Sequence, residues 1–315
     1  MRVAFLFPGQ GSQSVGMGKA LADARPEAAA VFAEVDEALG ENLSRLFLEG
    51  DADELGLTRN TQPALMAVSV AVHRVLLAEI GGVPASLAFH AGHSLGEYAA
   101  LAAAGSIALA DVARLLRLRG EAMQRAVPVG IGSMAALLGI EFDAAREVAA
   151  AASEVGEICE IANDNGGGQI VVSGHKAAVD RAMALAREKG AKRAVVLPVS
   201  APFHSTLMAP AAAEMAEALA AVTIAPPNVP VLSNVTARPH GGPDEIRRRL
   251  VEQITGTVRW RESVAYMAGE GVTSFYEIGA GKVLSGLVKR IASDADATSV
   301  GTPEEVGAAA GRLRN

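Results

Sequence analysis

One serine stands in a local sequence that can make its hydroxyl a nucleophile. The segment 92–96 reads GHSLG and fits Gly-x-Ser-x-Gly, in which the glycines let the chain turn sharply from a strand into a helix and leave the serine exposed. An apolar run (85–91) precedes it and a helix-forming run (97–104) follows it. We therefore expect Ser94 at a helix N-terminus, where free N–H groups stabilise developing negative charge.

A serine hydroxyl is too weakly acidic to attack unaided, so one of the six histidines must take its proton. His204 lies in a loop that leaves the last strand of an inserted unit and re-enters the main sheet, where α/β folds gather their binding loops. We expect it to be the base, oriented by a backbone carbonyl or a side-chain amide because no carboxylate stands out. The others are interpreted as structural: His73 in a long helix, His175 and His240 on surface loops, and His90 and His93 too near Ser94 in sequence.

The remaining glycine clusters and acidic pairs do not fit a cofactor or metal site. The GQG at 9–11 lacks the third glycine of a dinucleotide fingerprint, since position 14 is Ser14. The GAGK at 279–282 fails as a phosphate loop, because Tyr276 stands where the first glycine is needed and Val283 where a serine or threonine would bind the metal. No Cys/His spacing suggests zinc. We expect no metal and no bound cofactor.

The composition and net charge limit the classes of protein to which this chain can belong. The chain has 315 residues, half of them apolar, and only 4% aromatic, which predicts two subdomains with close-packed aliphatic cores in an α/β architecture. The net charge of −7 disfavours nucleic acid and anionic membranes. The lone Cys159 and the short N-terminal apolar run indicate a cytoplasmic protein. Prolines interrupt the uncharged stretch 194–213, so we read it as strand, loop and helix start rather than a membrane span.

The expected elements divide the chain into two domains. Outside the middle of the chain, predicted strands alternate with predicted helices, which indicates a parallel sheet. The strands are at 3–7, 85–91, 229–233 and 274–278, and the helices are at 26–39, 62–80, 209–222, 244–254, 262–269 and 282–291. The middle of the chain follows the βαββαβ order of a ferredoxin-like module. Its strands are expected at 133–140, 157–162, 169–173 and 192–199, and its helices at 143–155 and 176–189. We place this small domain at 128–199, inserted into a large domain of 1–127 and 200–315.

Six ordered motifs resemble those of the malonyl-CoA:acyl carrier protein transacylase family over almost the whole chain. They are FPGQGSQ at 7–13, GHSLGEY at 92–98, RLRG at 117–120, PFH at 202–204, VEQ at 251–253 and EIGAGKVL at 277–284. The resemblance implies an α/β-hydrolase-like large domain with an inserted ferredoxin-like small domain and an active site in the cleft between them.

The resemblance also implies roles for individual residues. Ser94 would attack the malonyl thioester while the backbone N–H groups of Gln10 and Leu95 stabilise the oxyanion. Arg119 would pair with the malonyl carboxylate, a geometry that suits the guanidinium fork. Gln253 would hold the histidine through its carbonyl, which supplies the missing orienting group.

Two further residues would shape the acyl pocket by resemblance. Phe203 would exclude a methyl branch on the substrate, favouring malonyl over methylmalonyl. Met123, four residues after Arg119 and thus on the same helix face, matches a pocket position, although a methionine at helical spacing is also ordinary core.

The implied reaction is ping-pong malonyl transfer of fatty acid biosynthesis. CoA leaves after malonyl-Ser94 forms, and the phosphopantetheine thiol of the acyl carrier protein then attacks; the phosphopantetheine belongs to the partner, and the family is commonly monomeric. An acidic carrier would need a local basic patch, for which 247–249 and 192–193 are candidates. Three alternatives remain: a discrete polyketide acyltransferase, a serine esterase or thioesterase, and a carrier-binding scaffold with a vestigial site.

Overall fold

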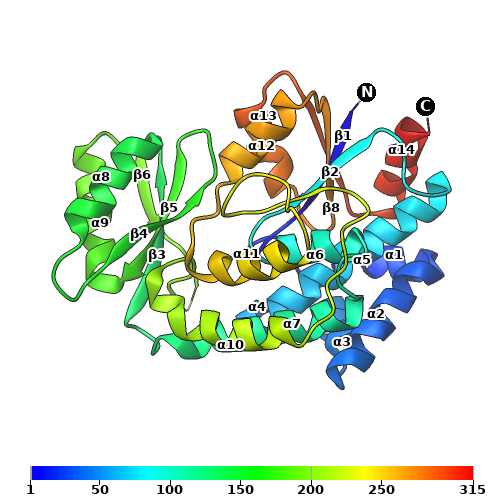
Figure 1. Cartoon of the computed structure of the whole chain (residues 1–315), viewed down its shortest axis with the longest axis horizontal. Helices are drawn as coiled ribbons and strands as arrows, with labels where there is room; N and C mark the ends of the chain where they lie inside the picture. The colour runs from blue at the N-terminus through cyan, green and yellow to red at the C-terminus, as the bar shows by residue number, and fades with distance from the viewer. Residues whose placement is uncertain (1, 200, 315) are drawn as a thin grey trace.

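The computed structural model describes residues 2–199 and 201–314 and divides into a large and a small domain (Figure 1). The large domain is built on a five-stranded parallel sheet in the order β7-β2-β1-β8-β9. Its strands are β1 (Val3–Phe7), β2 (Leu87–Gly92), β7 (Val231–Leu232), β8 (Ser274–Ile278) and β9 (Asp296–Val300). The predicted parallel sheet of an α/β fold is confirmed.

Helices cover both faces of this sheet, so the central strand β1 is buried along its whole length and is apolar throughout. In β1, Val3, Phe5 and Phe7 face the larger core, while Ala4 and Leu6 face the other. The first face is covered by α2 (Pro26–Leu39), α5 (Thr58–Ile80), α6 (Leu95–Ala103), α7 (Leu109–Ala126), α10 (Ala209–Ala220), α11 (Pro243–Thr255) and α14 (Pro303–Leu313), and the second by α12 (Trp260–Gly269) and α13 (Val283–Ile291).

The longest helix, α5, begins at Thr58, four residues before the predicted start, and contains Pro63. Proline has no N–H for the carbonyl of Arg59 one turn earlier, and that carbonyl accepts a hydrogen bond from Arg117 Nη1 at 2.8 Å instead. The helix is long and apolar enough to cross a bilayer, but most of it is buried in the core of the large domain.

The small domain has the predicted ferredoxin-like arrangement. Its antiparallel sheet has the order β4-β5-β3-β6, and its two helices share one core with one face of that sheet. Met134 and Ala136 on the opposite face belong to the large-domain core. The elements are β3 (Gly132–Leu138), α8 (Phe142–Ala152), β4 (Cys159–Asp164), β5 (Gln169–His175), α9 (Lys176–Glu188) and β6 (Arg193–Val196).

The two domains are joined by more than the connecting chain. Val258 donates its N–H to Ala162 O at 2.8 Å and accepts from Asp164 N at 3.0 Å, so the end of β4 pairs with a large-domain loop. Position 200, the expected second boundary, lies outside the described residues. The uncharged stretch 194–213 contains the end of β6, a loop with the short helix η1 (Thr206–Met208) and the start of α10, as predicted.

Several elements had no counterpart in the sequence prediction. Most predicted elements differ from the observed ones by a few residues at their ends, for example β7, which has two residues instead of five, while the strands at 3–7 and 274–278 and the helix at 26–39 match. The elements for which no range was predicted are α1 (Lys19–Ala24), α3 (Leu43–Glu49), α4 (Ala52–Gly56), α7, η1, β9 and α14.

Candidate active site

Ser94 stands in a strained turn between β2 and α6. Its backbone has φ 53° and ψ −113°, a conformation that costs a non-glycine residue free energy and is held by its surroundings. A Cβ on Gly92 would lie 1.9 Å from the Gly96 backbone, and one on Gly96 would lie 2.2 Å from Phe7 O. Both motif glycines are therefore required by close backbone packing.

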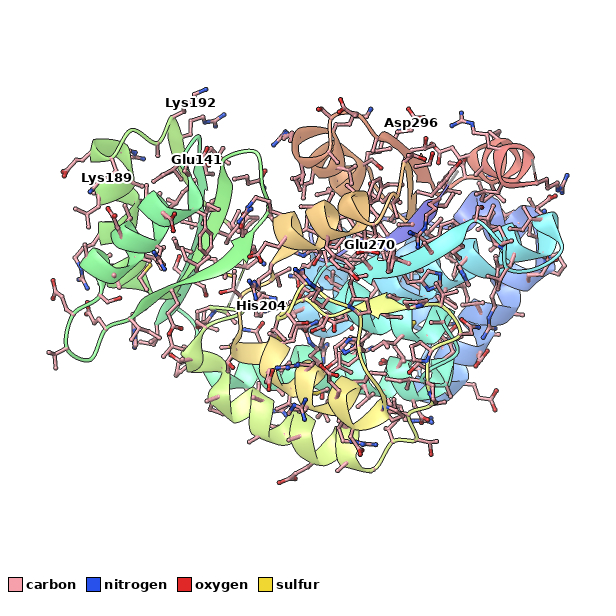
Figure 2. All side chains as sticks on the ribbon, turned by 45° about the horizontal axis from the view of Figure 1, so that its top comes forward. Glu141, Lys189, Lys192, His204, Glu270 and Asp296 are labelled. Carbon is pink, nitrogen blue, oxygen red and sulfur yellow. The ribbon has the colours of Figure 1, made fainter. Side chains whose placement is uncertain are left out.

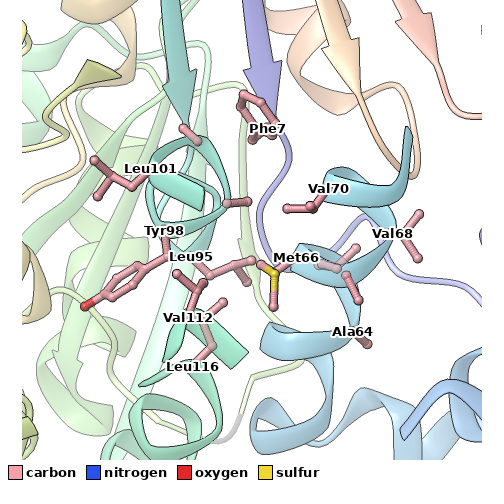
Figure 3. Close-up of a cluster of buried hydrophobic side chains, with 14 of the residues drawn as sticks. Phe7, Ala64, Met66, Val68, Val70, Leu95, Tyr98, Leu101, Val112 and Leu116 are labelled. Carbon is pink, nitrogen blue, oxygen red and sulfur yellow. The ribbon is translucent and has the colours of Figure 1, made fainter. Parts of the chain in front are cut away.

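The turn rests on a tightly packed apolar base. Figure 3 shows the Leu95 side chain directed from α6 toward Met66 of α5 and Val112 of α7, all of which are buried. Because the first turn of α6 is anchored in this cluster, the Ser94 hydroxyl is left on the opposite, cleft side.

His204 lies against the serine, between the two domains (Figure 2). Ser94 Oγ is 2.8 Å from His204 Nε2, and His204 Nδ1 is 2.8 Å from the main-chain oxygen of Gln253. Because a carbonyl only accepts, Nδ1 carries the proton and Nε2 is free to accept from the hydroxyl. Burial, reinforced by the nearby Arg119 cation, lowers the pKa of His204 to about 3, so the imidazole is neutral and able to act as a base.

Gln10 and Leu95 line the same cavity as Ser94. Within residues 2–199 and 201–314, no group accepts a hydrogen bond from either N–H. Leu95 is the first residue of α6, so its N–H is one of the unpaired donors of a helix start. The role of these two N–H groups as oxyanion donors stays a prediction.

Arg119 on α7 places a cation beside the serine in a buried environment. It is 1% exposed, and burial lowers its pKa. Nη1 donates to Gln62 Oε1 at 2.7 Å, and Nη2 donates to Gln253 Oε1 at 2.8 Å and to Ser94 Oγ at 3.1 Å. No carboxylate of the described residues lies within 4.0 Å of its guanidinium. Buried cations are costly unless paired, and the nearest carboxylate in this network, Glu97, reaches Arg119 only through the Gln253 amide.

These side chains surround a cavity of about 280 Å³ between the domains. Ser94, His204, Gln10, Leu95, Arg119, Met123 and Phe203 all line it. The small-domain side of the wall is formed by Met134, Asn163, Leu197, Pro198 and Val199.

Met123 and Gln253, two of the predicted site residues, occupy different positions relative to the cavity. Met123 is buried, and its Sδ accepts a hydrogen bond from Gln62 Nε2 at 3.8 Å. Gln253 does not line the cavity; it lies behind the wall, where its Nε2 donates to Ser94 O at 3.0 Å. It thus contacts the serine backbone, the histidine and the arginine.

His240 is not on a surface loop, and that prediction is wrong. Its side chain is fully buried, and Nε2 lies 2.8 Å from Glu97 Oε1. The loop folds back on β7, because His240 N donates to Val231 O at 2.9 Å. His175 is half-buried at the end of β5, where its Nδ1 accepts from Ile158 N.

Four functional-site contacts were missed by the sequence analysis. Gln62 and Asn234 bond directly to Arg119 and to the Ser94 backbone, and Glu97 and His240 lie behind them. Only Glu97 carried a sequence signal, since it stands three residues after Ser94 within the motif at 92–98.

The comparisons with known proteins agree with this geometry. Residues 4–308 match the family described as acyl transferase domain. The malonyl CoA-acyl carrier protein transacylase of Bacillus subtilis is 48% identical, with 97% of this chain and 95% of that protein covered. The crystal structure of the acyl-carrier-protein S-malonyltransferase of Bartonella henselae is 55% identical with a TM-score of 0.96, and 99% of each chain is covered.

A third similar protein was solved with its partner. It is a malonyl-transacylase in complex with the acyl-carrier protein of a type II polyketide synthase, 40% identical with a TM-score of 0.95, covering 99% of this chain and 100% of that one. Because the family model covers nearly the whole chain, this chain belongs to the acyl transferase family.

Proposed function

We propose that this protein is a malonyltransferase that carries malonyl from malonyl-CoA to the phosphopantetheine thiol of an acyl carrier protein. The observation that carries the proposal is the buried Arg119 cation, which has no carboxylate partner and lies 3.1 Å from Ser94 Oγ. Malonyl ends in a carboxylate that can pair with the guanidinium while its thioester carbon faces the serine. The names of the similar transferases support the same substrate.

In the first half-reaction, Ser94 Oγ attacks the thioester carbon and His204 Nε2 takes the hydroxyl proton. The N–H groups of Gln10 and Leu95 stabilise the oxyanion of the tetrahedral intermediate. When the intermediate collapses, the C–S bond breaks and the proton passes from His204 to the departing CoA sulfur. Malonyl-Ser94 remains.

In the second half-reaction, the carrier's thiol enters in place of CoA. His204 takes the thiol proton, the sulfur attacks the malonyl ester carbon, and the same two N–H groups stabilise the oxyanion. Collapse breaks the C–O bond to Ser94, which regains its proton from His204. No proton is gained or lost over the full cycle.

Acyl selection is proposed to come from charge and shape. Arg119 favours an acyl group that ends in a carboxylate, because an uncharged acyl group would leave the buried cation unpaired. Phe203 lines the cavity and is largely buried, and its ring is proposed to exclude a methyl branch. Met123 is proposed to complete the pocket wall beside Gln62.

The carrier could belong to fatty acid or to polyketide synthesis, and fatty acid biosynthesis is our proposal. The site engages the acyl group and a thiol, which are common to both carriers. The cluster 247–249 is a weak docking candidate, because Arg247 pairs with Asp244 and Arg249 with Glu252. We further propose a monomer in the cytoplasm. The buried position of α5 in the large domain supports a role for this helix in the core and not in a membrane.

The first experiment is intact-mass spectrometry of the purified protein after mixing with malonyl-CoA, without carrier, followed by peptide mapping. We expect a malonyl adduct on Ser94 that is lost on addition of a carrier thiol. Ser94→Ala should form none, whereas Ser293→Ala, at an exposed serine, should label like the wild type. Steady release of malonate without an adduct would instead identify a thioesterase, and neither adduct nor turnover would contradict both enzyme functions.

A further inference from the structure

A carboxylate that the reaction scheme does not use lies behind the candidate site. Glu97 is 0% exposed and stands in the first turn of α6, three residues after Ser94. Its Oε2 accepts from Gln253 Nε2 at 2.8 Å and from Asn234 N at 3.0 Å, and its Oε1 faces His240 Nε2 at 2.8 Å. Such a buried polar group is retained at a cost, often because it specifies one arrangement of its neighbours.

The Gln253 amide is the first of these neighbours. Its oxygen accepts from Arg119 Nη2 at 2.8 Å, while its nitrogen donates to Glu97 Oε2 and to Ser94 O. Arginine can only donate and an ionised carboxylate can only accept. Glu97 therefore holds the amide nitrogen on its own side and leaves the amide oxygen facing Arg119.

Gln253 also contacts the catalytic base, His204, through its main-chain carbonyl. Gln253 O accepts from His204 Nδ1 at 2.8 Å, and the side chain that Glu97 anchors belongs to this residue. The bond to Glu97 Oε2 thus restrains the side chain that orients the guanidinium, and it does so on the residue whose main-chain carbonyl sets the imidazole tautomer.

Asn234 is the second neighbour, and it clamps the strained turn. Its Oδ1 accepts from Ser94 N at 2.7 Å, and its Nδ2 donates to Gly92 O at 2.6 Å. Because Glu97 Oε2 accepts from Asn234 N, the carboxylate fixes the backbone from which this clamp projects. Ser94 and Arg119 are therefore both aligned on one buried group.

We propose that Glu97 is a positioning residue for acyl transfer: it fixes the Asn234 clamp that holds the Ser94 turn and, through the Gln253 amide, it aligns Arg119 on the substrate carboxylate. The inference rests on the proposed function, since it takes Arg119 as the group that recognises malonyl. It adds a residue that touches neither the acyl group nor the thiol.

A glutamine at position 97 keeps the size of the side chain but replaces one acceptor with a donor. If the new amide nitrogen faces Gln253 and Asn234, it meets two donors and no acceptor. If that nitrogen faces His240 Nε2, Nε2 must accept and the ring proton must move to Nδ1. His240 Nδ1 is buried without an acceptor among the described residues. Either arrangement leaves a buried donor unmatched, so the alignment of Arg119 is lost.

The test compares the rates at which malonyl-CoA and acetyl-CoA acylate Ser94, measured by quenched-flow mass spectrometry. Glu97→Gln should lower the malonyl-to-acetyl rate ratio by about tenfold or more, whereas Glu217→Gln, at an exposed glutamate on α10, should leave it unchanged. In an Arg119→Ala background, Glu97→Gln should cause no further change in the ratio. Gln253→Met, which removes the oriented amide and keeps the main-chain carbonyl, should lower the ratio like Glu97→Gln.

Other outcomes overturn the inference. An unchanged ratio in Glu97→Gln or in Gln253→Met would contradict it, even if the rates with both substrates fell equally. A fall in the ratio that persists without Arg119 would also contradict it. If the wild type itself forms no malonyl adduct, the proposed function fails, and that result is separate from any of these.

Discussion

At the scale of single residues, strain and burial concentrate on the groups assigned to the chemistry. Ser94 and His204 have φ angles of 53° and 56°, and among the described non-glycine residues only Ala237 shares this left-handed region. Such conformations persist where the surroundings over-determine them. Here the surroundings are the two glycines of the turn, the Asn234 clamp and the bond from His204 to the Gln253 carbonyl.

Arg119→Ala should reduce the acylation of Ser94 by malonyl-CoA by about 10- to 100-fold, because a charge-assisted hydrogen bond to the substrate carboxylate is lost. The rate with acetyl-CoA should change far less, since acetyl has no carboxylate. Initial rates with both thioesters give the comparison. Arg114→Ala is the matched control, because Arg114 is exposed on the same helix and pairs with Asp111. A parallel loss with both substrates would show that Arg119 is structural.

At the scale of elements, the strand–turn–helix unit around Ser94 is determined by close backbone approach. β1 and β2 are parallel neighbours, and the carbonyl of Phe7 at the end of β1 lies where a Cβ of residue 96 would project. The helix can start at Leu95 only because position 96 carries no side chain.

Gly96→Ala should displace this unit, abolish labelling of Ser94 by malonyl-CoA and lower the melting temperature by several degrees, because its Cβ would clash with backbone rather than with a movable side chain. Gly286→Ala on α13 is the control: no atom lies within 4 Å of its added Cβ, and alanine should stabilise that helix by up to about 1 kcal/mol. Melting curves and adduct mass measure both effects. Normal labelling in Gly96→Ala would contradict the assigned turn geometry.

At the scale of the whole molecule, the active-site cavity exists because two cores meet. The outer face of the small-domain sheet joins the large-domain core through Met134 and Ala136, and the pairing of Val258 with β4 ties the domains at the other end. A further bond crosses the cleft next to the nucleophile, since His93 Nε2 lies 2.9 Å from Asn165 Oδ1. The domains are thus held together by core packing, by backbone pairing and by a side-chain hydrogen bond.

The buried histidines make the whole fold sensitive to acid. His73 and His90 pack against Phe5 and Phe7 beneath the sheet, and burial lowers the pKa of His73 to about 4 and that of His90 well below its ordinary value. An unfolded histidine binds a proton near pH 6.5. As the pH falls from about 6.5 to 4, the unfolded chain binds protons that the folded His73 does not, so stability is lost.

For His73, this difference in proton binding lowers the free energy of unfolding by about 3 kcal/mol as the pH falls from 6.5 to 4. His73→Leu should therefore show a shallower fall in the free energy of unfolding over this range, measured by urea titration at several pH values. Between about pH 7 and 8, where an unfolded histidine is mostly neutral, the curves of variant and wild type should run parallel. Identical slopes below pH 6.5 would contradict the assignment.

The sequence by itself determined the strands at 3–7 and 274–278 and the helix at 26–39, which the structure reproduces residue for residue. It also predicted the serine turn and the βαββαβ order of the small domain, because period, glycine spacing and helix propensity are local properties. The assigned roles of Ser94, His204, Arg119, Gln10, Leu95, Gln253, Met123 and Phe203 remain predictions to be tested by the variants above.

Only the tertiary structure decided which polar groups are buried and which partners satisfy them. His240 and Glu97 are 143 residues apart, and Gln253 and Ser94 are 159 apart. No local pattern reports such pairs, because a hydrogen bond depends on distance and burial that exist only once the chain has folded. The sequence therefore predicted the kind of chemistry, and the fold determined the hydrogen-bond network around the predicted residues.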